Sequence, residues 1–574
     1  MGDNRKYRTL LLPAGVISLA VLCFKTYGEV LGYYFTSIDT FPLLLLGKLD
    51  SLQDIGKIFS SPLGGGFPFG SYYRPISELS YGIDYLIWGK NPMGYHITDI
   101  LLHLVNSTLV FLISGVLFKD YKKGLLAAWI SSILFLLSPI NLSIIPTMER
   151  RQDMLMALFF CLSLLAFSKV ERTEKNKTGW YLLSLTMGFL SIFSKESAFV
   201  LPILICISSF IFSEKNDYWE RGKQAIKHSI PFLGLTLLNT ILHIHFFGQW
   251  NVHVSSGVMQ RIEAATKSFF TFVGPLELLG FGMSLKVTVL FVVSLIFFLI
   301  FLRLIVRYGI RGFLDFILNK KMRIYTYLIA FILTFMALFT IKGTSHDFYH
   351  YLPNMALTTL IALLLIDTIS NKVISIMMKS IGAVFVIYIV MCSAIFTDYS
   401  AWRNSSDITR QIIKDTEQLL ASDKEASRIY LINWPGFIGS ESDIPGTNST
   451  ILVSYSMNAW AEWSGLRSLR DVQFVHISYA SFPAGDLKAN FNYTFFEKKI
   501  NMVVKGCQIS PSKIPYKGEV PFKFSVNEDK TVGEIIFTRQ LQDNERLFLY
   551  DTGGLKIIGR NFKFWPKGGG SPVS

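Results

Sequence analysis

The chain has 574 residues, of which 51% are hydrophobic, 14% aromatic and only 17% charged, and its mean hydropathy is +0.40. These values exclude an ordinary soluble protein and indicate a polytopic membrane protein. The formal net charge is +14, but the basic residues are spread between apolar segments. We therefore interpret them as membrane-topology signals and expect no nucleic-acid partner.

The cysteines indicate neither a disulfide framework nor a CxxC metal site, because their positions show no paired spacing. They are Cys23, Cys161, Cys206, Cys392 and Cys507. We expect no metal and no cofactor. The apolar run after the first residues lacks a clear small-residue cleavage site, so we predict a retained first span instead of a signal peptide.

We predict eleven membrane spans, some of them short for a bilayer crossing. They lie at about 10–32, 96–118, 125–145, 154–168, 180–194, 198–213, 229–247, 285–302, 324–341, 351–369 and 380–397. A cytoplasmic N-terminus places the cation-rich connections on the cytoplasmic side, among them 119–124 and 303–323. The apolar segment 266–283 is interpreted as re-entrant or interfacial. If it were a twelfth span, the cation-rich connection 303–323 would lie outside the cytoplasm.

The first external loop, residues 33–95, follows the first span. Its first carboxylate, Asp39, is predicted to lie near the membrane surface, where an acid is costly unless it is used or paired. Residues 49–59 have the apolar spacing of an amphipathic helix on the membrane. A Gly-rich connection then leads to Tyr72, Tyr73 and Arg74. Arg74 has two possible roles. It is either part of a functional site, or it lies in a loop that covers the membrane domain and only directs its charged end toward water.

The second span carries one polar stripe, with Asp99, His103 and Asn106 at positions i, i+4 and i+7. Polar residues inside a membrane usually face the interior of the helix bundle. These residues either hydrogen-bond to a neighbouring helix or, in the case of His103, shape a substrate cavity.

The outer connection after the third span reads PTMERRQDM and contains Glu149, Arg150, Arg151 and Asp153. A pair of arginines at a bilayer face suits a phosphate, because the guanidinium fork matches its oxygens. An internal ion-pair network with the two acids is the alternative.

Two further outer turns carry candidate residues. Lys195 and Glu196 lie between the fifth and sixth spans, where they either pair with each other or place the lysine against a lipid phosphate. The turn before the tenth span, KGTSHDFYHYLP, contains His346 and His350 at i and i+4. These histidines have the spacing of metal ligands but lack a clear third ligand.

The composition changes after residue 397, where a predicted helix, SSDITRQIIKDTEQLLASD, is followed by short β-like runs. The runs are RIYLIN, ILVSYSM, VQFVHISY, FKFSVN, GEIIFTR and RLFLYD. We therefore predict two domains: 1–397, a transmembrane domain, and 398–574, an extracytoplasmic soluble domain that is α+β or mostly β.

The chain resembles the membrane-embedded GT-C glycosyltransferases, which include the protein O-mannosyltransferases. Within them it is similar to the eukaryotic transmembrane O-mannosyltransferases with tetratricopeptide tails. The resemblance rests on SIDTF around Asp39, on YRPISELSYGIDYLIWGKNPMGYHITDILLHLVN at 73–106, on ERRQDML from Glu149, on SKESAFVLP from Ser194 and on YHYLP from Tyr349.

The resemblance implies a sugar donor carried on a polyprenyl or dolichyl phosphate, with Asp39 as the catalytic base. Many relatives have a second adjacent acid, where this chain has Thr40, so a metal-dependent mechanism is disfavoured. Relatives often have an arginine before the tyrosine of YHYLP, where this chain has Phe348. The tetratricopeptide tail is replaced by the β-rich domain, and the acceptor is therefore not implied.

We accordingly predict an inverting glycosyltransferase that moves a sugar from a polyprenyl-phosphate donor to an acceptor hydroxyl on the extracytoplasmic face. Asp39 removes the proton, and cationic side chains stabilise the leaving phosphate. The predicted phosphate-binding residues are Arg74, Arg150, Arg151 and Lys195. The predicted substrate cavity consists of Tyr73, Glu78, Asp99, His103, Glu149, Glu196, His346, Tyr349 and His350.

Two alternatives stay open. One is a transporter or assembly protein for lipid-linked glycans, although no internal repeat or matching broken spans are visible. The other is an oligosaccharide transferase with a diphosphate donor, a chemistry that favours a metal and paired acids. The acceptor is a protein, a lipid or a glycan, and the expected location is a prokaryotic plasma membrane rather than the endoplasmic reticulum.

Overall fold

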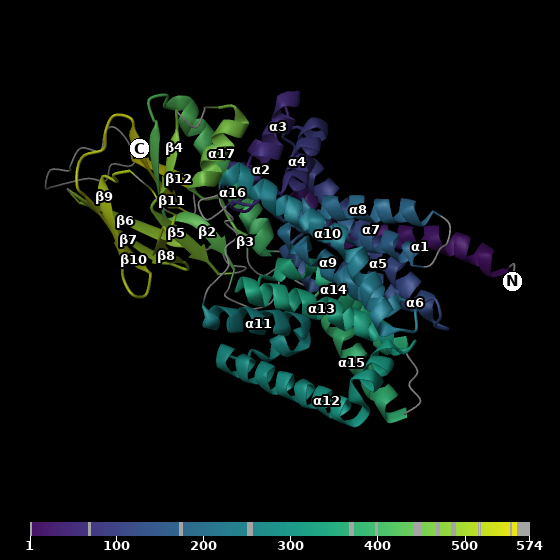
Figure 1. The fold of residues 1–574 in the computed structure, drawn as a ribbon. Helices are drawn as coiled ribbons and strands as arrows, with labels where there is room; N and C mark the ends of the chain where they lie inside the picture. Colours follow the sequence, from purple (N-terminus) through teal and green to yellow (C-terminus); the bar gives the residue numbers. More distant parts are fainter. Residues whose placement is uncertain are drawn as a thin grey trace.

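A computed structural model gives the fold of the chain (Figure 1). It describes residues 3–66, 71–171, 176–248, 257–366, 372–396, 400–439, 449–466, 471–483, 489–496, 498–514, 516, 518–551 and 554–558. The predicted domain boundary at 397/398 lies outside the described residues, as does the Gly-rich C-terminal end.

Each of the eleven predicted spans overlaps a helix. The helices are α1 (Asp3–Tyr27), α5 (Pro92–Leu117), α6 (Gly124–Leu137), α7 (Arg151–Val170), α8 (Lys177–Ile192), α9 (Leu201–Phe212), α10 (Tyr218–Phe247), α12 (Met283–Leu318), α13 (Met322–Lys342), α14 (Tyr351–Ile366) and α15 (Lys372–Met391). Within the described residues, nine segments are long and apolar enough to cross a membrane. The other two helices, α8 and α9, have 16 and 12 residues. The prediction of a polytopic helical membrane protein is confirmed.

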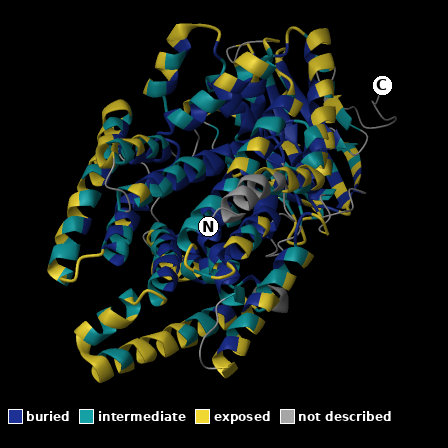
Figure 2. Cartoon of the chain, turned by 90° about the vertical axis from the view of Figure 1, so that its right-hand side faces the viewer, coloured by how far each residue is buried: buried dark blue, intermediate teal, exposed yellow. Residues whose placement is uncertain are grey.

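The helices differ in how far their neighbours cover them. The segments containing α6 and α14 are mostly buried, whereas no residue in the most apolar window of α12 is buried. Figure 1 accordingly places α12 at the edge of the bundle, and Figure 2 shows buried residues gathered in the interior with exposed ones along the outer helices. A helix that is apolar all round and uncovered by protein is suited to contact lipid.

The segment predicted to be re-entrant or interfacial forms no long helix. The helix α11 (Val258–Phe272) has 15 residues, and a 3-10 segment, η6 (Gly274–Leu279), follows it before α12 begins. This length falls short of the about 20 residues that a bilayer crossing needs.

The first external loop folds into α2 (Thr40–Leu46), α3 (Leu52–Ser60) and α4 (Pro75–Trp88), with the 3-10 segments η1 (Gly28–Gly32) and η2 (Leu63–Gly65). The predicted helix at 49–59 corresponds to α3, which begins at a capping box of Ser51 and Asp54. The first helical position of α4 is a proline, whose missing N–H costs nothing there.

The C-terminal part is α+β. Two helices, α16 (Ser400–Ser422) and α17 (Ser454–Ser464), accompany β1 (Arg428–Ile432), β2 (Trp434–Ile438), β3 (Ser449–Thr450), β4 (Gln473–His476), β5 (Ser478–Phe482), β6 (Asn490–Phe496), β7 (Lys499–Lys505), β8 (Gln508–Pro511), β9 (Phe522–Val526), β10 (Val532–Phe537), β11 (Glu545–Asp551) and β12 (Gly554–Ile558). Within the described residues, the strands form three four-stranded sheets, β12-β11-β1-β4, β6-β7-β10-β9 and β3-β2-β5-β8. In the first sheet β1 lies parallel to both neighbours.

The predicted strand at 451–457 is wrong. These residues lead into α17, whose side chains Met457, Trp460 and Trp463 are buried. A short apolar run does not distinguish a buried strand from a buried helix, and here packing favours the helix. The other five β-like runs each contain a strand.

The first loop and the C-terminal part share one hydrophobic core. Phe35 and Phe41 of the loop contact the Trp463 ring, with centroids 5.5 and 5.6 Å away. The Tyr34 N–H donates to the Ser406 hydroxyl over 2.8 Å. Figure 1 shows α17 beside α2. The loop is therefore packed against residues predicted to belong to the second domain.

Candidate active site

Asp39 lies at the N-cap of α2, where η1 and an extended segment bring the chain back from α1. Its main-chain N–H donates to Glu149 Oε2 over 2.9 Å, and the Tyr455 hydroxyl donates to Asp39 Oδ1 over 2.9 Å. Burial raises the pKa of the Asp39 carboxyl to about 7, and the nearby Glu149 adds to this effect. A carboxyl that titrates near neutral pH is suited to proton transfer.

Glu149 links Asp39 to a cation. It lies in the 3-10 segment η4 (Met148–Arg150), and its Oε1 is 2.5 Å from Arg150 Nη2. The Arg150 guanidinium lies over the Phe348 ring, 3.7 Å from its centroid. The Arg150 side chain is 20% exposed, more than those of Arg74 and Lys195. Arg150 is therefore more open to a ligand than Arg74 or Lys195.

A second cation, Arg74, lies just before α4. Its Nε and Nη2 donate to Glu196 Oε2 over 2.8 and 2.6 Å, its Nη1 donates to Gln152, and its guanidinium stacks over Tyr72. Of the two alternatives for Lys195, the pairing with Glu196 is not formed, because Glu196 accepts from Arg74 and Lys195 pairs with Asp153. The segment η5 (Glu196–Val200) begins directly after Lys195. The side chains of these two adjacent residues therefore point in different directions.

The third and fourth cations surround Tyr349 of η7 (Asp347–His350). Lys195 Nζ is 2.5 Å from Asp153 Oδ1 and 5.1 Å from the centroid of the Tyr349 ring. Lys342 Nζ donates to the Tyr349 hydroxyl over 3.0 Å. Both lysines therefore meet the aromatic turn that also contacts Arg150 through Phe348.

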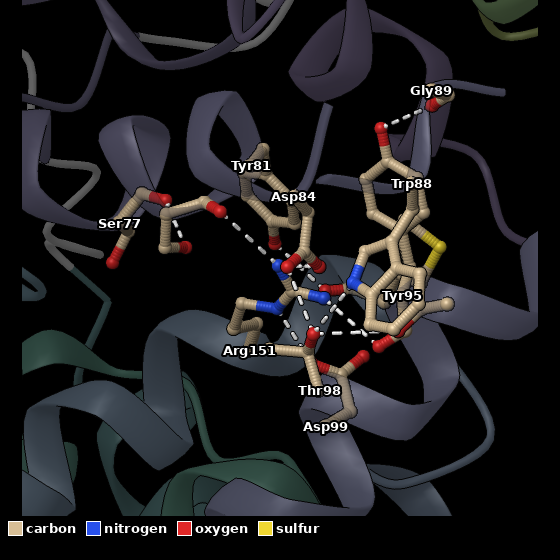
Figure 3. A network of polar contacts seen from close by, with 12 residues as sticks. Ser77, Tyr81, Asp84, Trp88, Gly89, Tyr95, Thr98, Asp99 and Arg151 are labelled. Atoms are coloured by element: carbon tan, nitrogen blue, oxygen red, sulfur yellow. Dashed lines mark hydrogen bonds and ion pairs between the residues drawn. The ribbon is translucent and has the colours of Figure 1, made fainter. Parts of the chain in front are cut away.

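Predicted site residue Arg151 occupies a different place (Figure 3). Its Nε is 2.5 Å from Asp99 Oδ1, its Nη1 is 2.6 Å from Asp84 Oδ2, and its Nη2 donates to the Tyr95 carbonyl over 3.1 Å. The arginine is completely buried. Its donors are thus committed to an internal network that joins α7 to α4 and α5, and Asp99 belongs to this network with it.

Four other predicted cavity residues lie in packed surroundings. The Tyr73 hydroxyl donates to the Phe59 carbonyl, and the buried Glu78 accepts from the Gly64 N–H over 3.4 Å. His103 Nδ1 is 2.8 Å from the Tyr351 hydroxyl. His350 is buried, with its ring against Phe272 and Phe339. His346, in contrast, lies beside the cation group, stacked on Phe348.

Three residues near Asp39 and the cations escaped the sequence analysis. Gln152 and Lys342 lie in the outer connections that held other candidates, so proximity along the chain was a usable signal. No signal in the sequence pointed to Tyr455, because it lies 416 residues after Asp39 in a run predicted as a strand.

The assembled group contains four cations and four acids. The cations are Arg74, Arg150, Lys195 and Lys342, and the acids are Asp39, Glu149, Asp153 and Glu196. Burial lowers the pKa of the Lys195 amine to about 7, so this amine is only partly charged at neutral pH. The two arginines keep their charge and are the fixed cations available to an anionic ligand. Among the described residues, no group of three or more His, Cys, Asp or Glu side chains is arranged to hold a metal ion.

Comparison with known families gives a match inside the membrane region. Residues 79–245 match the family model described as dolichyl-phosphate-mannose-protein mannosyltransferase. The resemblance predicted from the sequence is confirmed there. This range includes Glu149, Arg150, Lys195 and Glu196, whereas Asp39, Arg74 and Tyr455 lie outside it.

The similar proteins are O-mannosyltransferases by name. Protein O-mannosyl-transferase Tmtc1 of Drosophila melanogaster is 26% identical over 243 residues, covering 39% of this chain and 27% of that protein. Human Protein O-mannosyl-transferase TMTC4 is 35% identical over 140 residues, covering 22% of this chain and 19% of that protein. The chain thus spans less than a third of these relatives.

Among solved structures, the crystal structure of ArnT from Cupriavidus metallidurans bound to undecaprenyl phosphate aligns with the chain. It is 11% identical, with a TM-score of 0.42, and the alignment covers 82% of this chain and 92% of that one.

Proposed function

We propose that the chain is a glycosyltransferase that moves one sugar from a polyprenyl-phosphate donor to an acceptor hydroxyl. The observation that carries this proposal is the placement of Asp39, a carboxyl with a pKa of about 7, beside Glu149 and Arg150 at the edge of a four-cation group. The family match over residues 79–245 supports the same donor class. A protein hydroxyl is the acceptor suggested by the relatives' names, and lipid and glycan hydroxyls are the alternatives.

In the proposed reaction the acceptor oxygen attacks the anomeric carbon while Asp39 takes the acceptor's proton. The bond from that carbon to the phosphate oxygen breaks, and its electron pair leaves with the lipid phosphate. This leaving group is already anionic, so it needs cationic stabilisation rather than a proton. One displacement assisted by one base gives inversion at the anomeric carbon.

Arg150 is the cation that we propose as the main contact of the phosphate. It has one carboxylate partner and a partly exposed guanidinium, whereas Arg74 is held by Glu196 and Gln152. Lys342 and, in its protonated form, Lys195 contact the same aromatic turn and supply further positive charge. Arg151 is omitted from this role because its partners are internal.

The proposed site faces the extracytoplasmic side. The cation-rich connections, including Lys119, Lys122 and Lys123, lie at the other ends of the predicted spans, as expected for cytoplasmic loops. This orientation also places the C-terminal part outside the cytoplasm.

The test is sugar release and transfer by the purified full-length chain with radiolabelled polyprenyl monophosphate and diphosphate sugars, including dolichyl-phosphate mannose. Turnover of a monophosphate donor supports the proposal. Turnover of diphosphate donors alone favours the oligosaccharide transferase. Tight binding with vectorial movement into vesicles and no bond cleavage favours the transporter.

We expect Arg150→Ala to lower kcat/KM for the donor by about 100-fold, because a charge-assisted contact to the leaving phosphate is lost. Steady-state kinetics with the active monophosphate donor measures this. Lys267→Ala is the matched control, since Lys267 is a half-exposed cation on α11 that pairs with Glu263. Equal losses in both variants would contradict a specific role for Arg150.

Turnover should depend on pH through Asp39. Its pKa is raised to about 7, so the carboxylate needed as base dominates above that pH and is lost below it. We expect kcat to fall by about tenfold per pH unit well below pH 7. A profile that stays flat down to pH 5 would exclude Asp39 as the base.

A further inference from the structure

Two consecutive residues at the start of α17 hydrogen-bond to the residues just before α2. Tyr455 donates to Asp39 Oδ1 over 2.9 Å, and the hydroxyl of the next residue, Ser456, donates to the carbonyl of Ile38. At the other end of α17, Trp463 packs on Phe41. The C-terminal part thus holds both ends of the segment that carries the candidate base.

The charged and titratable groups that face Asp39 come from three other elements. Glu149 and Arg150 come from η4, Arg74 from the start of α4, and Tyr455 from α17. Burial and the neighbouring Asp39 raise the pKa of the Tyr455 phenol far above neutrality. Tyr455 therefore keeps its proton at neutral pH, acts as a hydrogen-bond donor and cannot serve as the base itself.

We propose that Tyr455 is a positioning residue that fixes the Asp39 carboxylate, so that the C-terminal part completes the active site. The inference rests on the proposed function of Asp39. Because Oδ1 is engaged by the phenol, the orientation of the carboxylate is set, and Oδ2 is the oxygen that receives the acceptor proton. The donated hydrogen bond also stabilises the ionised form of Asp39.

The first test measures the protonation of Asp39 without turnover. A hydrophobic carbodiimide modifies protonated carboxyls, and peptide mass spectrometry gives the extent of Asp39 labelling against pH. In the wild type the labelling should fall as pH rises through about 7. In Tyr455→Phe the midpoint should rise by about one pH unit, because a donor to the carboxylate is lost. An unchanged midpoint would overturn the proposal.

Two further variants of the chain distinguish the loss of the Tyr455–Asp39 hydrogen bond from a general disturbance of the fold. Tyr493→Phe removes a hydroxyl that donates to the Tyr550 carbonyl within the C-terminal part, far along the chain from the site, and should leave the Asp39 midpoint unchanged. If Tyr455→Phe does not fold, trifluorotyrosine at position 455 keeps the shape of the ring. Its more acidic phenol should lower the midpoint, and a midpoint equal to that of the wild type would overturn the proposal.

The second test is turnover of dolichyl-phosphate mannose, or of whichever monophosphate donor proves active. We expect Tyr455→Phe to lower kcat by about fivefold at pH 7, to reach most of the wild-type kcat at pH 9 and to leave the donor KM unchanged. A uniform loss at all pH values indicates a structural role only and contradicts the proposal. If Asp39→Asn is fully active, the proposed role of Asp39 as the base fails, while the labelling result still decides whether Tyr455 fixes Asp39. If no polyprenyl-phosphate sugar is turned over by the wild type, the proposed function itself fails.

Discussion

Asp39→Asn should lower kcat by about 1,000-fold, within the range for loss of a general base. Asparagine keeps the size of the side chain and can still accept a hydrogen bond from Tyr455, so the site should stay assembled. It cannot take a proton from the acceptor. Single-turnover sugar transfer with saturating donor measures the chemical step, and the donor KM should change little because the cations remain.

The matched control for this variant is Asp50→Asn. Asp50 is an exposed acid of the same external loop and pairs with Lys48. The Asp50→Asn variant should transfer sugar at the rate of the wild type. A normal rate in Asp39→Asn would show that another acid is the base. Glu149 is then the first alternative, because it accepts the Asp39 N–H and pairs with Arg150.

Arg151→Met should destabilise the protein by about 3–5 kcal/mol, the cost of leaving buried charges without their partner. Asp84 and Asp99 would both lose the guanidinium that lies between them (Figure 3). Methionine approximates the aliphatic part of the side chain, so the loss should come mainly from the charges. Unfolding of the purified protein in detergent, followed by denaturant or heat, measures the change.

Neutralising the two acids tests the same explanation. The triple variant with Asp84→Asn and Asp99→Asn should recover part of the lost stability, because no unpaired charge stays buried. Arg403→Met is the control, since Arg403 pairs with Glu29 at the surface. If Arg151→Met unfolds like the wild type but binds donor poorly, Arg151 is a phosphate-binding residue as the sequence predicted.

The sequence was most informative about the membrane helices and about Asp39. Long apolar segments predict spans because a bilayer requires them, and an acid just after the first span stands out for its cost. The pairing of side chains was much less predictable. Successive helical residues point about 100° apart, which is why Arg150 lies near Asp39 while Arg151 faces α4 and α5.

The outer ends of the helices add to this difficulty. The segments η4, η5 and η7 are short 3-10 turns that set the directions of Glu149, Glu196 and Tyr349. Such turns have no strong periodic signal. Tyr455 was out of reach for another reason, because the helix that carries it is selected by packing against α2 rather than by its own pattern.

The core shared by the first loop and the C-terminal part also affects biosynthesis. Phe35 and Phe41 emerge early, but their partner Trp463 is made more than 400 residues later. At a translation rate of about 5–20 residues per second, Trp463 is synthesised roughly 20–80 s after the loop. During this interval the two rings have their contact with each other, and Phe35 has its contact with Tyr95, but both rings lack Trp463. We therefore expect the membrane surface or a chaperone to cover the apolar face that Trp463 later occupies.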